Sequence, residues 1–275
     1  MIDVQNRPDD RNIPIDQVGV TDLLYPIAVP DPRTGCQNTV ANVSMMVNLT
    51  HNFRGTHMSR FIEMLNAYRD QVTLETTVDM AHELQKRLQA TSARVELDFP
   101  YFIEKYAPVS RAPGLMEYRC AFVGASSPEG DDAVLRVTVP VTTLCPCSKE
   151  MSRYGAHNQR GSVSVEVRTV SGARIDIEEL VEVAENSASA PVYALLKRED
   201  EKILTEHAYE NPVFVEDLVR NLAQRLMTDP RIDWFRVEAV SLESIHNHNA
   251  FARIEWRRQA DGHGAGSLKE NEKER

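Results

Sequence analysis

The feature that most constrains the fold is the order in which strand and helix patterns follow one another. In the first half of the 275-residue chain a strand precedes two amphipathic helices and three further strands. In the second half a strand precedes three helices and two closing strands. This order predicts an α+β protein with two modules of antiparallel sheet and paired helices, although no sequence repeat relates them; a single mixed sheet is the alternative. The strands are expected at 39–49, 95–99, 116–124, 133–143, 162–168, 233–242 and 248–257, and the helices at about 61–68, 77–91, 177–187, 191–206 and 213–227.

Both ends of the chain lack this periodicity. Residues 1–20 are rich in Asp, Arg, Asn and Pro and predict a flexible N-terminal arm, whereas residues 259–275 predict a disordered charged tail. The first module is then expected at 21–145 and the second at 146–258. The N-terminal segment is polar and mixed in charge, which is unlike a signal peptide.

The composition excludes several classes of function. A hydrophobic content of 42% and a charged content of 26% are typical of a soluble globular protein. The formal net charge of −10 argues against a general nucleic-acid binder and against an anionic membrane surface. No apolar run approaches the roughly 20 residues of a membrane span. Four cysteines without an export signal indicate a reducing cytoplasm, where a Cys-X-Cys sequence is more often catalytic or metal-binding than disulfide-bonded.

Two cysteines and a histidine follow the strand expected at 133–143. Cys145 and Cys147 flank Pro146, which would stiffen the turn, and His157 lies in a loop between two glycines. Thiolate and imidazole groups suit a zinc-like ion or a nucleophilic thiol site. Because alternate residues of an extended segment point to opposite sides, one cysteine is expected to face the site, and Cys147 is favoured because it heads a short helical segment. Buried structural cysteines and a solvent-exposed histidine are the alternatives.

A second group of polar residues lies between the two closing strands. His246 and His248 are separated by one residue, so their side chains are expected on the same side, where they could bind a metal or transfer protons. Glu243 ends a strand face of small and apolar residues and could accept hydrogen bonds from an N–H pair such as the edge of a guanine. An ordinary polar hairpin turn with a carboxylate at its rim is the alternative.

Cations and hydroxyls gather in a chain that is acidic as a whole. Such groups at the start of a helix can hold phosphates, whereas charge runs on helices are usually solvated faces. Glu216, one turn into a helix, could act as an acid or base or could pair with Arg220 four residues later. The residues alone therefore predict a metal- or thiol-dependent enzyme acting on a small anion. The candidate phosphate-binding residues are Arg54, His57, Ser59 and Arg60, whereas the dense charge run at 195–202 is typical of a solvated helix face.

These motifs together resemble those of one family, the GTP cyclohydrolase IB enzymes of prokaryotes. The matching segments follow one another in a single order over about 54–251, which is far more specific than any one motif. They are Gly55-Thr56-His57-Met58-Ser59-Arg60-Phe61, Leu144-Cys145-Pro146-Cys147-Ser148-Lys149-Glu150, Gly155-Ala156-His157-Asn158-Gln159-Arg160, Leu195-Leu196-Lys197-Arg198 with Asp200-Glu201-Lys202, Asn211-Pro212-Val213-Phe214-Val215-Glu216-Asp217 and Glu243-Ser244-Ile245-His246-Asn247-His248-Asn249-Ala250-Phe251.

The resemblance implies a tunnelling fold, a homotetramer with active sites at subunit interfaces, and a divalent metal such as zinc, manganese or iron. The implied reaction converts GTP and water to 7,8-dihydroneopterin triphosphate and formate, the first step of tetrahydrofolate biosynthesis. The residues implied as metal ligands are Cys147, His157 and Glu201, with Cys145 as the alternative thiol. Those implied in catalysis are Cys147, Glu216, His246 and His248, and Glu243 is implied in binding guanine. The residues implied in binding the triphosphate are Arg54, His57, Ser59, Arg60, Lys197 and Arg198.

Two rival hypotheses differ in chemistry. Nitrile reductases of queuosine synthesis share the tunnelling fold but attack the substrate with a cysteine thiolate and need no metal. In such an enzyme His157 and Glu201 would have no clear function. A structural or sensory metal protein would instead require four protein ligands that fill the coordination shell of the metal, and it would have no substrate pocket.

Overall fold

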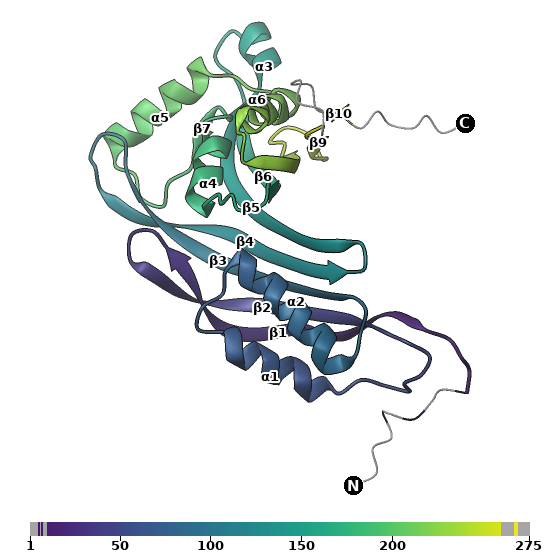
Figure 1. The fold of residues 1–275 in the computed structure, drawn as a ribbon. Helices are drawn as coiled ribbons and strands as arrows, with labels where there is room; N and C mark the ends of the chain where they lie inside the picture. Colours follow the sequence, from purple (N-terminus) through teal and green to yellow (C-terminus); the bar gives the residue numbers. More distant parts are fainter. Residues whose placement is uncertain (1–4, 6, 8–9, 260–266, 269–275) are drawn as a thin grey trace, which may run out of the picture. The chain divides into compact units, whose positions relative to one another are not determined.

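The computed structural model describes residues 5, 7, 10–259 and 267–268, and they form two compact units (Figure 1). The first unit contains the described residues up to Tyr101 together with Cys120–Leu135, and the second contains Phe102–Arg119 and the described residues from Arg136 onward. Three long strands contribute residues to both units, so the units are not two successive pieces of chain. The modules expected at 21–145 and 146–258 divide the chain by sequence order and stay a prediction. The tail expected at 259–275 lies almost wholly outside the described residues.

The first unit is a sheet with two helices against it. Its strands are hydrogen-bonded in the order β1-β2-β3-β4-β5. α1 lies against β1, and α2 lies against both α1 and β2 (Figure 1). The elements are β1 (Ile15–Asp31), β2 (Gly35–Leu49), α1 (Met58–Tyr68), α2 (Leu74–Leu88) and parts of β3 (Ala93–Tyr106), β4 (Pro113–Ser127) and β5 (Gly130–Leu144).

Strand β1 corrects the expectation for the N-terminal segment, because it begins at Ile15, inside the arm predicted at 1–20. Its pairing with β2 shifts register twice, between Ile15 and Val18 and between Val20 and Leu23, so its residues do not alternate cleanly between buried and exposed. A search for strict alternation therefore misses this strand.

The helices of the first unit bury the faces that their spacing predicted. Phe61, Met64 and Leu65 of α1 are fully buried. Helix α2 begins three residues before the expected position because Thr73 and Thr76 form a reciprocal cap: the Thr76 N–H donates to Thr73 Oγ1 at 3.1 Å, and the Thr73 N–H donates to Thr76 Oγ1 at 2.8 Å. This cap uses threonine where the usual pattern has Glu or Gln.

The second unit has the strand order β3-β4-β5-β6-β8-β9-β10, with the short β7 paired to β5. The alternation expected in its strands is confirmed, since Val163, Val165 and Val167 are buried, and the helix α6 packs against β8 and β9 (Figure 1). No helix among the described residues is long and apolar enough to span a bilayer. The elements are α3 (Pro146–Met151), β6 (Asn158–Thr169), α4 (Ile177–Glu185), β7 (Ala190–Pro191), α5 (Arg198–Glu210), α6 (Val215–Thr228), β8 (Ile232–Ser241), β9 (Ala250–Arg257) and β10 (Ser267–Leu268).

Helix α5 begins later than expected. The predicted helix at 191–206 is wrong over its first seven residues, because the helix starts at Arg198 and ends at Glu210. Asp200 decides this start: its Oδ2 accepts a hydrogen bond from the Lys197 N–H at 2.9 Å, which caps the helix at that residue.

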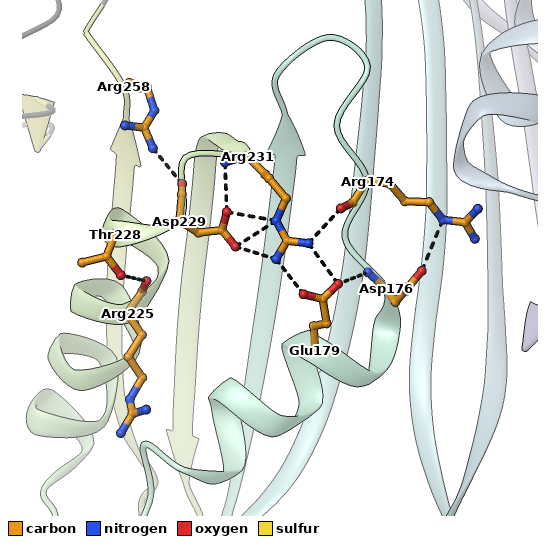
Figure 2. A network of polar contacts seen from close by, with 8 residues as sticks. All are labelled: Arg174, Asp176, Glu179, Arg225, Thr228, Asp229, Arg231 and Arg258. Atoms are coloured by element: carbon orange, nitrogen blue, oxygen red, sulfur yellow. Dashed lines mark hydrogen bonds and ion pairs between the residues drawn. The ribbon is translucent and has the colours of Figure 1, made fainter. Parts of the chain in front are cut away.

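Figure 2 shows an ion-pair network that joins α4 to the turn between α6 and β8. The guanidinium of Arg231 lies 2.6 Å from a carboxylate oxygen of Glu179 and 2.7 Å from one of Asp229, and it also donates to the Arg174 carbonyl at 3.1 Å. Arg258 donates to the backbone carbonyl of Asp229 at 2.8 Å. The hydrogen bonds from Arg231 lower the pKa of both the Glu179 and the Asp229 carboxyl.

Candidate active site

The two candidate thiols differ in their surroundings at the start of α3. Cys145 is the N-cap residue, and Pro146 occupies the first turn, where its fixed φ and missing N–H suit a helix start. The Cys145 Sγ accepts a hydrogen bond from the Ser148 N–H at 3.4 Å. Cys147, inside the first turn, is exposed. The helix thus begins one residue before Cys147, and Cys147 is the thiol that does not cap it.

His157 is held beside this turn by its own backbone. The Cys145 N–H donates to the His157 carbonyl at 3.1 Å, and the His157 N–H donates to Ser148 Oγ at 3.0 Å. Gly155 permits the intervening turn, since its φ of 137° lies in the region that favours glycine. Hydrogen bonds therefore close the loop between the cysteines and the histidine and hold His157 beside the turn that contains Cys145 and Cys147.

The loop between β8 and β9 lies next to His157. Ser244 Oγ is 3.4 Å from His157 Nδ1. The rings of His246 and His248 stack with centroids 5.1 Å apart and planes 18° apart, which confirms that both side chains lie on the same side. Both histidines are exposed, and Glu243 is half-buried just beyond the end of β8.

Glu216 lies in the first turn of α6. The Val213 N–H just before this helix donates to the Leu144 carbonyl at 3.0 Å, so the helix starts beside the end of the strand that leads to the cysteines. Arg220 pairs with Asp217 at 3.3 Å rather than with Glu216. Glu216 is exposed, and its part in a site stays a prediction.

Glu201 lies at the opposite end of α5 from the part that touches α3. The contact with α3 is a hydrogen bond from Lys149 Nζ to the Tyr209 carbonyl at 2.5 Å, in the last turn of α5. Glu201 is in the first turn, about 12 Å away along the helix axis. Within the part of the chain that the structure describes, no three His, Cys, Asp or Glu side chains gather so as to hold a metal.

The remaining cationic candidates belong to both units. Arg54, His57, Ser59 and Arg60 lie in the first unit at the start of α1, with His57 as its N-cap residue. The Arg60 guanidinium donates to the Arg87 carbonyl at 2.6 Å, so it is already engaged by the end of α2. His57 and Arg60 line a cavity of about 50 Å³, which is too small for a nucleotide. Lys197 and Arg198, in the second unit, are exposed at the start of α5.

One residue with a positioning role was not singled out from the sequence: Asp200, fully buried within a dense charge run. Its carboxylate accepts hydrogen bonds from the N–H groups of Val109 at 2.8 Å and Ser110 at 2.9 Å and from the Ser110 hydroxyl at 2.6 Å, besides that from Lys197. Burial alone would raise the pKa of Asp200, but these hydrogen bonds outweigh burial and lower it. The residue was missed because the run reads as a solvated face.

A second such residue is Gln159, whose Oε1 lies 2.9 Å from His157 Nδ1. The two residues are two positions apart at the start of β6, which places their side chains on the same side of the strand. That spacing is the signal by which the sequence could have indicated Gln159.

The arrangement of strands and helices identifies the fold of this chain. It is similar to the uricase of Arthrobacter globiformis, with a TM-score of 0.52 and 9% identity over 89% of this chain and 94% of the uricase. It is also similar to the urate oxidase of Bacillus sp. TB-90, with a TM-score of 0.51 and 8% identity over 89% of this chain and all of that one. At such identities the likeness shows the fold alone, which is the tunnelling fold, as expected.

The family follows from sequence comparison. The model of the type I GTP cyclohydrolase FolE2 family matches residues 1–252. The GTP cyclohydrolase FolE2 of Geotalea uraniireducens is 53% identical over 262 residues, covering 95% of this chain and 96% of the relative. That of Geobacter sulfurreducens is 56% identical over 255 residues, covering 93% and 98%. The chain belongs to the type I GTP cyclohydrolase FolE2 family and is an enzyme of the GTP cyclohydrolase I type.

Proposed function

We propose that this chain hydrolyses GTP to 7,8-dihydroneopterin triphosphate and formate, the first step of tetrahydrofolate biosynthesis. The observation that carries the proposal is the closed turn that holds Cys145, Cys147 and His157 together in a chain that matches the family over residues 1–252. None of the four cysteines, all of which lie among the described residues, forms a disulfide, which suits a reaction in a reducing cytoplasm.

The donor set fits a divalent metal ion. A thiolate, an imidazole and a carboxylate together are borderline in softness and accept zinc, manganese or iron(II). When bound, such an ion would supply an activated water near neutral pH. Cys147, His157 and Glu201 would hold it, and Cys147 is preferred to Cys145 because it is exposed, whereas Cys145 is half-buried and caps α3.

The carboxylate of Glu201 would reach this site from another copy of the chain. In one chain it lies at the end of α5 away from α3, and the described residues bring no three ligand groups together. A homotetramer with sites between subunits meets this requirement, because each interface then joins the thiol and imidazole of one copy to the carboxylate of another.

The other side chains would bind the purine and move protons. The carboxylate of Glu243 can accept two parallel hydrogen bonds, from N1–H and from the amino group of guanine. Glu216, His246 and His248 are exposed groups able to give and take protons as the imidazole ring opens. The triphosphate would be held by the exposed Arg54, Ser59, Lys197 and Arg198 and by the half-buried His57. Arg60, whose guanidinium donates to the Arg87 carbonyl, is the weakest candidate.

The activity is tested with chelator-treated protein. Zinc, manganese or iron(II) is added back in turn with GTP, and formate and the fluorescence of dephosphorylated neopterin are followed. Cys147→Ala is expected to abolish both metal binding and formate release, whereas Cys36→Ala, which alters an exposed cysteine at the start of β2, is the matched control. Full activity of Cys147→Ala would overturn the ligand assignment, and turnover insensitive to chelators would favour a thiol mechanism.

The sharing of the site between copies is tested by mixing two inactive variants. Cys147→Ala and Glu201→Gln chains, unfolded and refolded together, should regain about a quarter of the wild-type activity, because random assembly leaves that share of sites with both groups intact. Cys147→Ala mixed with His157→Ala is the control: both defects lie on the same side of the interface, so no activity should return. Failure of the first mixture would place Glu201 in the same chain as Cys147.

A further inference from the structure

A chain of side-chain hydrogen bonds leads away from His157 into the core of the second unit. Gln159 Oε1 lies 2.9 Å from His157 Nδ1, Gln159 Nε2 donates to Thr143 Oγ1 at 3.2 Å, and Thr143 Oγ1 lies 3.3 Å from Ser241 Oγ. Thr143 and Ser241 are almost completely buried, with exposed fractions of 1% and 2%. They come from β5 and β8, the two neighbours of β6 in the sheet, so three adjacent strands build this chain.

The Gln159 amide lies between the Thr143 hydroxyl and the His157 ring, with Nε2 toward the hydroxyl and Oε1 toward the ring. A glutamine amide has one oxygen that only accepts and one nitrogen that only donates. Since Nε2 donates to the Thr143 hydroxyl, Oε1 is the atom presented to His157. An accepting oxygen 2.9 Å from Nδ1 requires the proton of the neutral imidazole to be on Nδ1.

The proton on Nδ1 leaves the other ring nitrogen with its lone pair. Metal ions bind the unprotonated nitrogen of a neutral imidazole, and the second nitrogen of such ligands is usually held by a carbonyl or carboxylate oxygen. Ser244 also lies near Nδ1, but at 3.4 Å, and its hydroxyl can either donate or accept, so it cannot select the tautomer.

We infer that Gln159 is a positioning residue that holds His157 with its proton on Nδ1 and so prepares Nε2 to bind the divalent metal. The inference rests on the metal-dependent activity proposed above. It assigns the Thr143 and Ser241 hydroxyls a second role, because Thr143, itself hydrogen-bonded to Ser241, accepts the Gln159 N–H and so holds this side chain beside His157.

The test measures metal affinity rather than turnover. Zinc and cobalt binding to metal-free protein are titrated against a chromophoric chelator. Gln159→Leu keeps the approximate size of the side chain but removes the acceptor, and it should weaken binding about 10- to 100-fold. Gln159→Glu keeps an acceptor for Nδ1–H and should bind at least as tightly as the wild type. Thr143→Val, which removes the acceptor for the Gln159 N–H, should give a smaller loss.

Two controls separate positioning from folding and from the metal assignment. Asn158→Leu alters the exposed neighbour of His157 on the other side of the strand and should leave affinity unchanged. The thiolate-to-cobalt absorption of Gln159→Leu at saturating cobalt should match the wild type, because the ligands themselves remain. Thermal unfolding of each metal-free variant shows whether the second unit is intact.

The outcomes distinguish this inference from the proposed function. If His157→Ala loses metal but Gln159→Leu binds as the wild type does, the positioning role is overturned and the metal site stands. Equal losses in Gln159→Leu and Gln159→Glu would mean that the amide acts by packing, which also overturns it. If neither the wild type nor any variant binds metal, both proposals fail together.

Discussion

Two consecutive helices of the second unit, α5 and α6, are held in place by different means. Helix α6 buries a continuous apolar stripe, consisting of Val215, Leu218, Val219, Leu222, Ala223 and Leu226. Helix α5, of nearly the same length, buries only Asp200 and Ala208. The first is fixed by loss of apolar surface to water, whereas the second is fixed by polar contacts at its two ends.

The difference lies in what fixes the direction of each helix. Apolar packing tolerates exchange among side chains of similar size, but it gives little directional control. The hydrogen bonds of Asp200, in contrast, fix the direction of the first turn of α5, where Lys197, Arg198 and Glu201 lie. The residues of α5 that we propose to contact a substrate or another copy of the chain therefore lie on a helix with almost no core of its own.

The largest effect on stability is expected from the apolar stripe. Leu222→Ala removes a fully buried side chain from α6 and should lower the free energy of unfolding by about 3 kcal/mol, from lost transfer energy and the cavity left behind. The kcat of the protein that remains folded should be unchanged. Denaturant unfolding with parallel activity assays measures both, and a loss below about 1 kcal/mol would show that α6 is not fixed by its apolar face.

The contrast also explains what the sequence could and could not predict. The pattern at 213–227 gave α6 within a residue or two because its apolar periodicity is continuous, but the helix start expected at Asn211-Pro212 is wrong, since Asn211 ends α5 and Phe214 is the N-cap of α6. The start of α5 was misplaced because its anchor, Asp200, binds backbone groups of Val109 and Ser110 that are distant in sequence. Propensity along a single segment contains no information on such partners.

The same limit applies to the candidate site. The Cys145–His157 turn could be found as a motif because its residues are close in sequence and its closure is local. The partners of Gln159 come from β5 and β8, so only the paired strands reveal them. Strand β1 was missed for a related reason, since its register shifts hide the alternation that β2 imposes on it.

The next effect concerns the polar anchor of α5. Asp200→Ala removes the acceptor for four hydrogen bonds and should reduce kcat/KM about 100-fold, because a shift of about 1 Å in the first turn misplaces the groups it carries. Asp200→Asn, which can still accept some of these bonds, should lose less. Steady-state kinetics measures the effect. Glu199→Ala, at an exposed neighbouring position, is the control. Wild-type kcat/KM in Asp200→Ala would show that these hydrogen bonds do not fix the position of α5.

A smaller effect is expected at the end of α6, where the Arg231 network adds polar contacts to an apolar helix. Arg231→Ala should lower the free energy of unfolding near neutral pH by about 1–2 kcal/mol, a value reduced for the solvent screening of these partly exposed groups. The matched control is Arg174→Ala, which removes the ion pair with Asp176 but leaves the backbone carbonyl that Arg231 contacts.

The same network predicts the direction of a pH effect. Arg231 lowers the pKa of Glu179 and Asp229 in the folded protein below the values in the unfolded chain. Their stabilising contribution is therefore fully present above the unfolded pKa and is lost as the pH falls through the folded pKa. The wild type should lose more stability than Arg231→Ala between neutral pH and about pH 3, measured by urea unfolding, and parallel curves would contradict the assignment.

The smallest effect is expected on the outer face of α5. Ile203 is 45% exposed, so Ile203→Ala removes little buried surface, and alanine is the better helix former, which offsets part of the loss. The free energy of unfolding should change by less than about 0.5 kcal/mol, against the much larger loss at Leu222, although both changes shorten an aliphatic side chain on neighbouring helices. Urea unfolding of both variants at two protein concentrations measures these changes in the free energy of unfolding. A larger loss that grows with protein concentration would mean that another copy of the chain covers this face, and α5 would then owe part of its stability to apolar contacts between copies.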